Sequence, residues 1–155
     1  MIFLDISLAA GVTGLGMLLG ACAYESVVIN PNYRADIPQS LEHMRDFMKV
    51  KTPANFFRVL SPVTMLLLLV SVIAAWRVDA VRWWLVGSLV ILIAADTITY
   101  AFHYPRNRIL FIDKLSPDKD MLKRLAREWQ TGNEIRIVLL VMAFLTLLTG
   151  VFSIA

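Results

Sequence analysis

Three polar side chains lie near the end of the third of four long apolar segments in the chain. Asp96, Tyr100 and His103 follow the spacing i, i+4, i+7, so a helix places them on one face. An ionisable side chain inside an apolar segment is costly, which makes it a candidate functional residue. Because histidine titrates near neutral pH, this face could carry a base. The structural alternatives are a buried ion pair at Asp96 and a helix-ending role for His103.

A second polar stripe begins the fourth apolar segment. Trp129, Asn133 and Arg136 repeat the same spacing. If both stripes face inward, they enclose a pocket in which Trp129 is a flat wall and Arg136 binds an anion. Arg58 enters from the same side, either as a second cation in the pocket or as an interfacial anchor. Asn107 is a further candidate for substrate contact, although its type and position are also typical of a turn, and Trp129 also suits an interfacial aromatic belt.

Length and composition predict a membrane protein of one domain, residues 1–155. The chain has 155 residues, of which 58% are hydrophobic. Four windows approach the roughly 20 apolar residues that cross a bilayer. A four-residue connection between the second and third windows makes them antiparallel neighbours. The sequence therefore predicts an all-α, four-helix antiparallel bundle in contact with the lipid bilayer, with spans at about 3–23, 55–76, 81–103 and 135–155.

Two long loops, 24–54 and 104–134, connect the predicted spans. Each contains a stretch with apolar residues on one side of a helix, and we expect short amphipathic helices there, over about 38–50 and 117–132. Asn30-Pro31-Asn32-Tyr33 is typical of a turn, and Ser40 is a candidate N-cap. Thr52-Pro53 predicts the N-cap and first residue of the second span.

The charge distribution predicts topology. The net charge is +3, and all 15 Lys and Arg residues except Arg77 and Arg82 lie in or beside the two long loops. The positive-inside rule places both loops in the cytoplasm and both termini outside, as in a bacterial inner-membrane protein. Because the basic residues are explained by topology, we expect no nucleic-acid partner. Residues 1–10 contain no Lys or Arg, so we expect a retained helix in place of a cleaved signal peptide.

Several chemistries are excluded by missing residues. Cys22 is the only cysteine, so a disulfide or cysteine-based metal cluster within the chain is impossible. The two histidines, His43 and His103, are 60 positions apart, and there is no HExxH, P-loop, GxGxxG or GxSxG motif. We therefore expect neither a metal nor an organic cofactor.

Gly16 and Gly20 form a GxxxG pair that permits close approach of a helix, either within the chain or from a homo-oligomer or partner protein.

Two short motifs carry a family resemblance. Pro105 and Asn107 follow the third span as P-x-N, and Trp129 and Arg136 precede the fourth in the pattern W-x3-H-x2-R, with Asn133 at the usual histidine position. In these motifs and in its layout the chain resembles the anthrone oxygenase-like family of small four-helix membrane proteins. The resemblance implies oxygenation of a phenolic polycyclic substrate without a cofactor, through a carbanion that reacts directly with oxygen.

The resemblance also implies roles for individual residues. Since Asn133 cannot titrate, His103 would be the base, assisted by Asp96, and Arg136 would hold the phenolate or enolate. The residues expected to bind the substrate are Trp129, Asn133, Asn107, Tyr100 and Arg58. The alternative is a non-enzymatic subunit that binds a lipid or quinone, or serves as a scaffold in a membrane complex.

Overall fold

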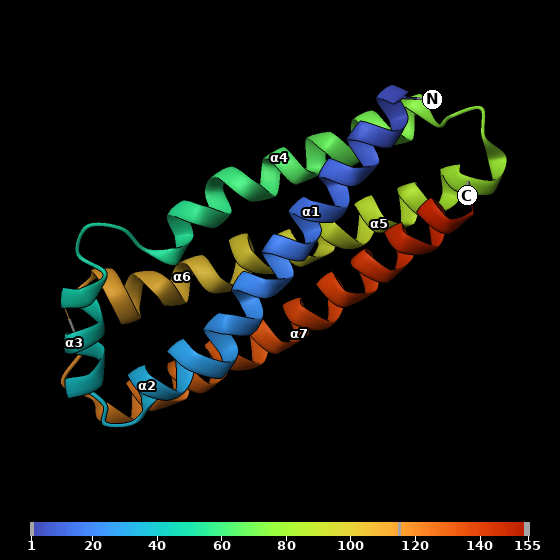
Figure 1. Ribbon diagram of the computed structural model, residues 1–155. Helices are drawn as coiled ribbons and strands as arrows, with labels where there is room; N and C mark the ends of the chain where they lie inside the picture. The colour runs from blue at the N-terminus through green and yellow to red at the C-terminus, as the bar shows by residue number, and fades with distance from the viewer. Residues whose placement is uncertain (1, 115, 154–155) are drawn as a thin grey trace.

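The computed structural model describes residues 2–114 and 116–153, and these residues contain helices and no strand. Four long helical segments run antiparallel to one another in a single bundle (Figure 1). Each of them is long and apolar enough to cross a membrane. The predicted all-α membrane bundle is confirmed, and the chain is a multi-pass membrane protein.

Three of the four segments are longer than a bilayer requires. The first consists of α1 (Ile2–Tyr24), η1 (Glu25–Ile29) and α2 (Asn30–Arg34), and the second is α4 (Pro53–Ala74). The third consists of α5 (Asp79–Ile98), η2 (Thr99–His103), α6 (Tyr104–Asn107) and η3 (Arg108–Ile112), and the fourth is α7 (Lys119–Phe152). A helix of 34 residues is about 50 Å long, whereas the hydrocarbon core is about 30 Å thick.

The parts of these segments that exceed the length needed to cross a bilayer lie at one end of the bundle. There α3 (Gln39–Phe47) lies across the ends of the long segments, beside α2 and η3 (Figure 1). The start of α1, the end of α7 and the short α4–α5 connection lie at the opposite end (Figure 1). The end that carries α3 therefore has room for a site enclosed on several sides.

Three prolines, Pro31, Pro62 and Pro105, lie inside the long segments without ending them, and π-helical segments precede the first and the third. The sequence predicted a turn at Asn30-Pro31, but the helix continues through it to Arg34. The π-helical segment η1 precedes Pro31, and the Asn30 N–H bonds to the carbonyl of Glu25, five residues back. The η2 segment precedes Pro105 in the same way, with Tyr104 bonded to Thr99. Proline clashes with the normal hydrogen-bond pattern of an α-helix, and a π-helical turn before it lets the chain continue in helical form.

The starts of the helices follow local sequence signals, with one exception. Thr52 is the N-cap of α4, as predicted, and its N–H bonds to Asn55 Oδ1 at 2.8 Å. Asp118 caps α7 by accepting from the N–H groups of residues 120 and 121, both at 3.0 Å. The prediction that Ser40 caps α3 was wrong. That helix begins at Gln39, and the Ser40 hydroxyl donates to the backbone carbonyl of Tyr33, near the end of α2.

The interior contains two apolar clusters. The larger fills the bundle along α1, α4, α5 and α7, with Leu15, Leu68, Leu85 and Leu92 fully buried. The smaller joins α2, α3, η3 and α7 around Tyr33. Many large apolar side chains also lie exposed on the outer faces of the long helices, which is expected where lipid is the solvent. Between the two clusters lies a group of buried polar residues.

The glycines of α1 face two different environments. A Cβ at Gly11 would lie 3.1 Å from Leu68, and one at Gly14 would clash with Thr64, so these glycines permit close packing on α4. A Cβ at Gly16 would meet only Phe144, at 3.7 Å, and one at Gly20 would meet nothing within 4 Å. The Gly16/Gly20 face is therefore open on the outside of the bundle, and its use by a partner helix stays a prediction.

Gly132 and Gly20 form a matched pair for testing the packing of the bundle. A Cβ at Gly132 would lie 2.6 Å from the Phe102 ring, so we expect Gly132→Ala to lower the free energy of unfolding by about 1–2 kcal/mol through overpacking. Gly20→Ala should be neutral or raise it by up to about 1 kcal/mol through helix propensity. Unfolding in detergent by an SDS titration measures both changes. A marked loss of stability in Gly20→Ala would show that this open face packs against another helix.

Candidate functional site

Arg136 is the centre of the buried polar group between the two apolar clusters. It lies on α7 and is only 5% exposed. Its Nη2 atom forms an ion pair with Glu25 Oε2 of η1 at 3.2 Å, and its Nη1 atom donates to Thr99 Oγ1 of η2 at 3.1 Å. The guanidinium also lies 4.7 Å from the centre of the Phe57 ring of α4. One side chain therefore contacts all three of the other long segments.

Asn133 supports this arrangement from one turn earlier on α7. Its Oδ1 accepts from Arg136 Nη2 at 3.0 Å, and its Nδ2 donates to the backbone carbonyl of Cys22 at 3.1 Å. Asn133 is fully buried, and a buried amide is stable only when its polar atoms have partners. It orients the guanidinium and connects α7 to the end of α1.

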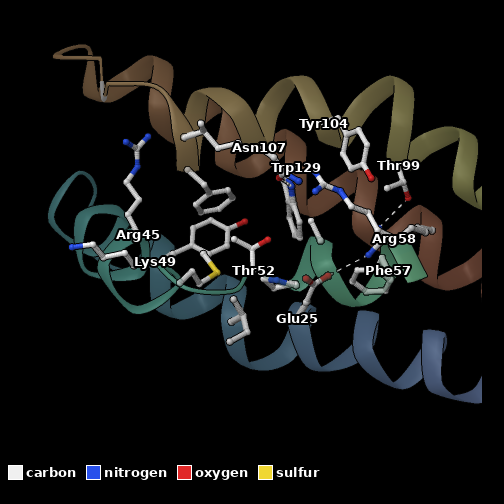
Figure 2. A pocket seen from close by; sticks show the side chains of 18 residues that line it. Glu25, Arg45, Lys49, Thr52, Phe57, Arg58, Thr99, Tyr104, Asn107 and Trp129 are labelled. Carbon is white, nitrogen blue, oxygen red and sulfur yellow. Dashed lines mark hydrogen bonds and ion pairs between the residues drawn. The ribbon is translucent and has the colours of Figure 1, made fainter. Parts of the chain in front are cut away.

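A cavity of about 450 Å³ opens above this polar group. Glu25, Thr99 and Arg136 line the side of the cavity that we call its floor, and residues 48–49 and 52–54, between α3 and the start of α4, also line it. Figure 2 shows Glu25 and Thr99 among the lining side chains. Within the described part of the chain, Glu25 is the only carboxylate that lines it. The cavity falls in the range of about 300–1,000 Å³ that is usual for small-molecule sites.

Aromatic side chains form much of the cavity wall. Trp129 is held by its indole N–H, which donates to Asn107 Oδ1 at 2.6 Å (Figure 2). Tyr33 packs edge-to-face against Trp129 at 6.1 Å and against Phe111 at 5.4 Å. The Tyr33 hydroxyl is buried and has no hydrogen-bond partner among the described residues. An unpaired buried hydroxyl beside a cavity is available to a ligand.

Four of the residues predicted from the sequence line this cavity: Arg58, Asn107, Trp129 and Arg136. Asn133 lies directly behind Arg136. The structure therefore brings together most of the second polar stripe and its expected neighbours. The tie between Trp129 and Asn107 also places the two family motifs in contact.

The first polar stripe is placed differently. His103 is 1% exposed, does not line the cavity, and lies behind Trp129 with 4.8 Å between the ring centres. Asp96 lies deeper, where it accepts a hydrogen bond from Ser61 at 2.6 Å and borders a separate void of about 10 Å³ beside Arg136. Tyr100 is exposed on the outside and packs against Tyr104 at 5.1 Å. The sequence spacing places the three residues on one face of a regular α-helix. Tyr100 and His103 lie within the π-helical segment η2, which has more residues per turn, so their side chains are rotated relative to Asp96.

Glu25 and Tyr33 are the functional candidates that the sequence analysis missed. They belong to the series Glu25, Ile29, Tyr33, which repeats every four residues and therefore lies on one helical face. All three line the cavity. This four-residue spacing can be seen in the sequence. It was not recognised because residues 24–54 were interpreted as a loop that turns at Pro31.

The described side chains that line the site carry one carboxylate, one amide, several hydroxyls, three guanidinium groups and one ammonium group. Across residues 2–114 and 116–153, no group of three or more His, Cys, Asp and Glu side chains is arranged to hold a metal ion. Glu25 can accept a proton, and the Nε–H of Arg136 is buried without a hydrogen-bond partner among the described residues, so it is the donor of this guanidinium that is left for an oxyanion. Aromatic walls around that pair suit a planar ring system.

Fold and site together define a four-helix membrane protein with an aromatic cavity above a buried acid–guanidinium pair. The family model of anthrone oxygenase matches residues 47–146, which is 100 of the 155 residues. The chain therefore belongs to the anthrone oxygenase family, and the resemblance found in the sequence is confirmed. No curated protein and no solved structure matches the chain. The family match includes Asn107, Trp129, Asn133 and Arg136, whereas Glu25 lies outside it.

The Glu25–Arg136 pair can be tested by breaking it in two ways. We expect Arg136→Met to lower the free energy of unfolding by about 3–5 kcal/mol, because it leaves the Glu25 carboxylate buried without a partner. The double variant Glu25→Leu/Arg136→Met removes both charges and should lie much closer to the native stability. SDS unfolding of the purified proteins measures both. Equal losses in the single and double variants would show that the charges are not coupled.

Proposed function

We propose that the protein oxygenates a planar phenolic polycyclic compound of the anthrone type without a cofactor. The observation that carries this proposal is the buried Glu25–Arg136 pair at the floor of an aromatic cavity of about 450 Å³. Membership of the anthrone oxygenase family supports the same reaction class. The cavity has room for three fused rings, and the rings of Trp129, Tyr33 and Phe57 provide apolar surfaces on several sides of it.

The reaction begins with loss of a proton from the methylene carbon of the anthrone. Glu25 is the carboxylate that faces the substrate and is proposed as the acceptor of this proton. The electron pair left on the carbon is delocalised into the carbonyl group, so negative charge develops on oxygen. The Arg136 guanidinium and the Tyr33 hydroxyl donate toward that oxygen, which stabilises the charge as it develops.

Oxygen then reacts with the electron-rich carbon. Transfer of one electron to O2, followed by formation of the C–O bond, gives a hydroperoxide once a proton is returned. Loss of water from the hydroperoxide gives the quinone. The sum is one anthrone and one O2 converted to one anthraquinone and one water, so the substrate itself supplies the electrons and no external reductant is required.

This assignment differs from the roles that the sequence suggested. His103 was expected to be the base, assisted by Asp96. We propose Glu25 in its place, because Glu25 lines the cavity while His103 lies behind Trp129 and Asp96 is bonded to Ser61. His103 and Asp96 then contribute by supporting Trp129 and the floor of the cavity.

Activity measurements on purified protein test the role of Glu25. Incubation with an anthrone should consume one O2 for each quinone formed, and Glu25→Gln should lower kcat by about 10²–10⁴-fold because the base is lost. Glu134→Gln, an exposed glutamate on α7, is the matched control and should retain native activity. Full activity in Glu25→Gln with loss in His103→Gln would return the role of base to His103. Tight binding of the quinone without any turnover would favour a quinone-binding subunit.

The membrane orientation is proposed from charge. The end of the bundle that carries α3 and the cavity holds nearly all of the basic residues, so we place it in the cytoplasm, with both termini outside. In a Cys22→Ala background, the variants Arg77→Cys and Lys123→Cys each carry a single cysteine, and the two cysteines lie at opposite ends of the bundle. An impermeant maleimide added to intact bacterial cells should label the cysteine at position 77 and should label that at position 123 only after lysis. The reverse pattern would invert the topology.

A further inference from the structure

The charges that line the cavity do not balance. Four cations, at Arg45, Lys49, Arg58 and Arg136, face a single carboxylate, Glu25, among the described lining residues. Glu25 and Arg136 form an ion pair and neutralise one another. Arg45, Lys49 and Arg58 therefore have no carboxylate partner among the described residues that line the cavity.

The three remaining cations are engaged to different degrees. Arg45 holds the end of η3 through hydrogen bonds to the backbone carbonyls of Leu110 at 2.8 Å and Ile109 at 3.1 Å, so its guanidinium is committed to the fold. Arg58 forms neither an ion pair nor a side-chain hydrogen bond within residues 2–114 and 116–153, and it lies 5.9 Å from the Tyr104 ring centre. Its donors are available to a ligand.

The placement of Arg58 suits recognition of a ligand. It lies on α4, and both Arg58 and Arg136 line the same cavity. Figure 2 shows the Arg58 side chain extending between Tyr104 and Trp129, while Lys49 lies at the outer rim. A guanidinium presents a planar fork that binds carboxylate or phosphate oxygens in pairs.

We propose that the cavity takes an anionic ligand, a polycyclic phenol with a carboxylate or similar anionic oxygen group that Arg58 binds. This inference rests on the proposed function and names its substrate class. The anionic group lies against the Arg58 guanidinium, and the reacting carbon lies at the Glu25–Arg136 floor. Attraction between the charged group and Arg58 then orients the ring system before the proton is removed.

Equilibrium binding of two matched, unreactive anthraquinones tests this proposal. Anthraquinone-2-carboxylate and anthraquinone-2-carboxamide have the same ring system and differ in charge. In nanodiscs of neutral phosphatidylcholine, we expect the carboxylate to bind the native protein about tenfold more tightly or better, as a charged hydrogen-bonded pair allows. Because both ligands are products of the proposed type, binding is measured without turnover.

Three variants separate the charge of Arg58 from its shape. Arg58→Gln should weaken carboxylate binding about tenfold while the carboxamide changes less than about twofold. Arg58→Lys, which keeps the charge and loses the planar fork, should retain part of the preference. Arg127→Gln removes an exposed cation of α7 that does not line the cavity and should change neither affinity.

The possible results separate this proposal from the proposed function. A carboxylate preference that depends on Arg58, in a protein that oxygenates no anthrone, supports the anion site and removes the reaction. If neither anthraquinone binds, retention of phosphatidylglycerol that is lost in Arg58→Gln, measured by native mass spectrometry, supports the anion site with a lipid headgroup as the source. Equal affinity for the two anthraquinones, a preference that survives Arg58→Gln, or no binding of any of these anions overturns the proposal.

Discussion

The buried guanidinium of Arg136 is the interaction on which the rest of the structure depends. A charge removed from water must find an opposite charge and hydrogen-bond acceptors nearby, because an unpaired buried ion costs several kcal/mol. Arg136 meets this need through Glu25, Thr99 and Asn133, and it rests on the ring of Phe57. These partners come from all four long segments, so the helices must meet at one level for the charge to be satisfied.

The same requirement explains why a functional site lies at this level. Groups held in place by several hydrogen bonds and an ion pair are already oriented, so little reorganisation is needed when a ligand arrives. Two of the three prolines inside the long segments contribute to this arrangement. Pro31 and Pro105 are each preceded by a π-helical segment, and these segments carry Glu25 and Thr99, the two residues from other helical segments that form hydrogen bonds with Arg136. The helices thus depart from regular geometry at the position where the site is built.

The elements that sequence patterns could predict were those with a local cause. Thr52 was correctly predicted as an N-cap, because a cap depends on the side chain and the next few residues. The four spans depend only on length and apolar composition. The Asn30-Pro31 turn was predicted wrongly, because proline usually ends a helix and only packing against α7 and α3 decides that this one continues. Glu25 was not predicted as a site residue, because the expected turn at Asn30-Pro31 placed it in a loop.

The sequence by itself determined the membrane class, the all-α architecture and the identity of the second polar stripe, because apolar length and helical spacing do not depend on distant contacts. It also contained the motifs that place the chain in its family. Only the tertiary structure decided which acid pairs with Arg136. Glu25 is 111 positions away from it, and a choice among Glu25, Asp96 and His103 depends on how the helices are rotated against one another. The long-range packing of the bundle sets that rotation, and no pattern within a single helix records it.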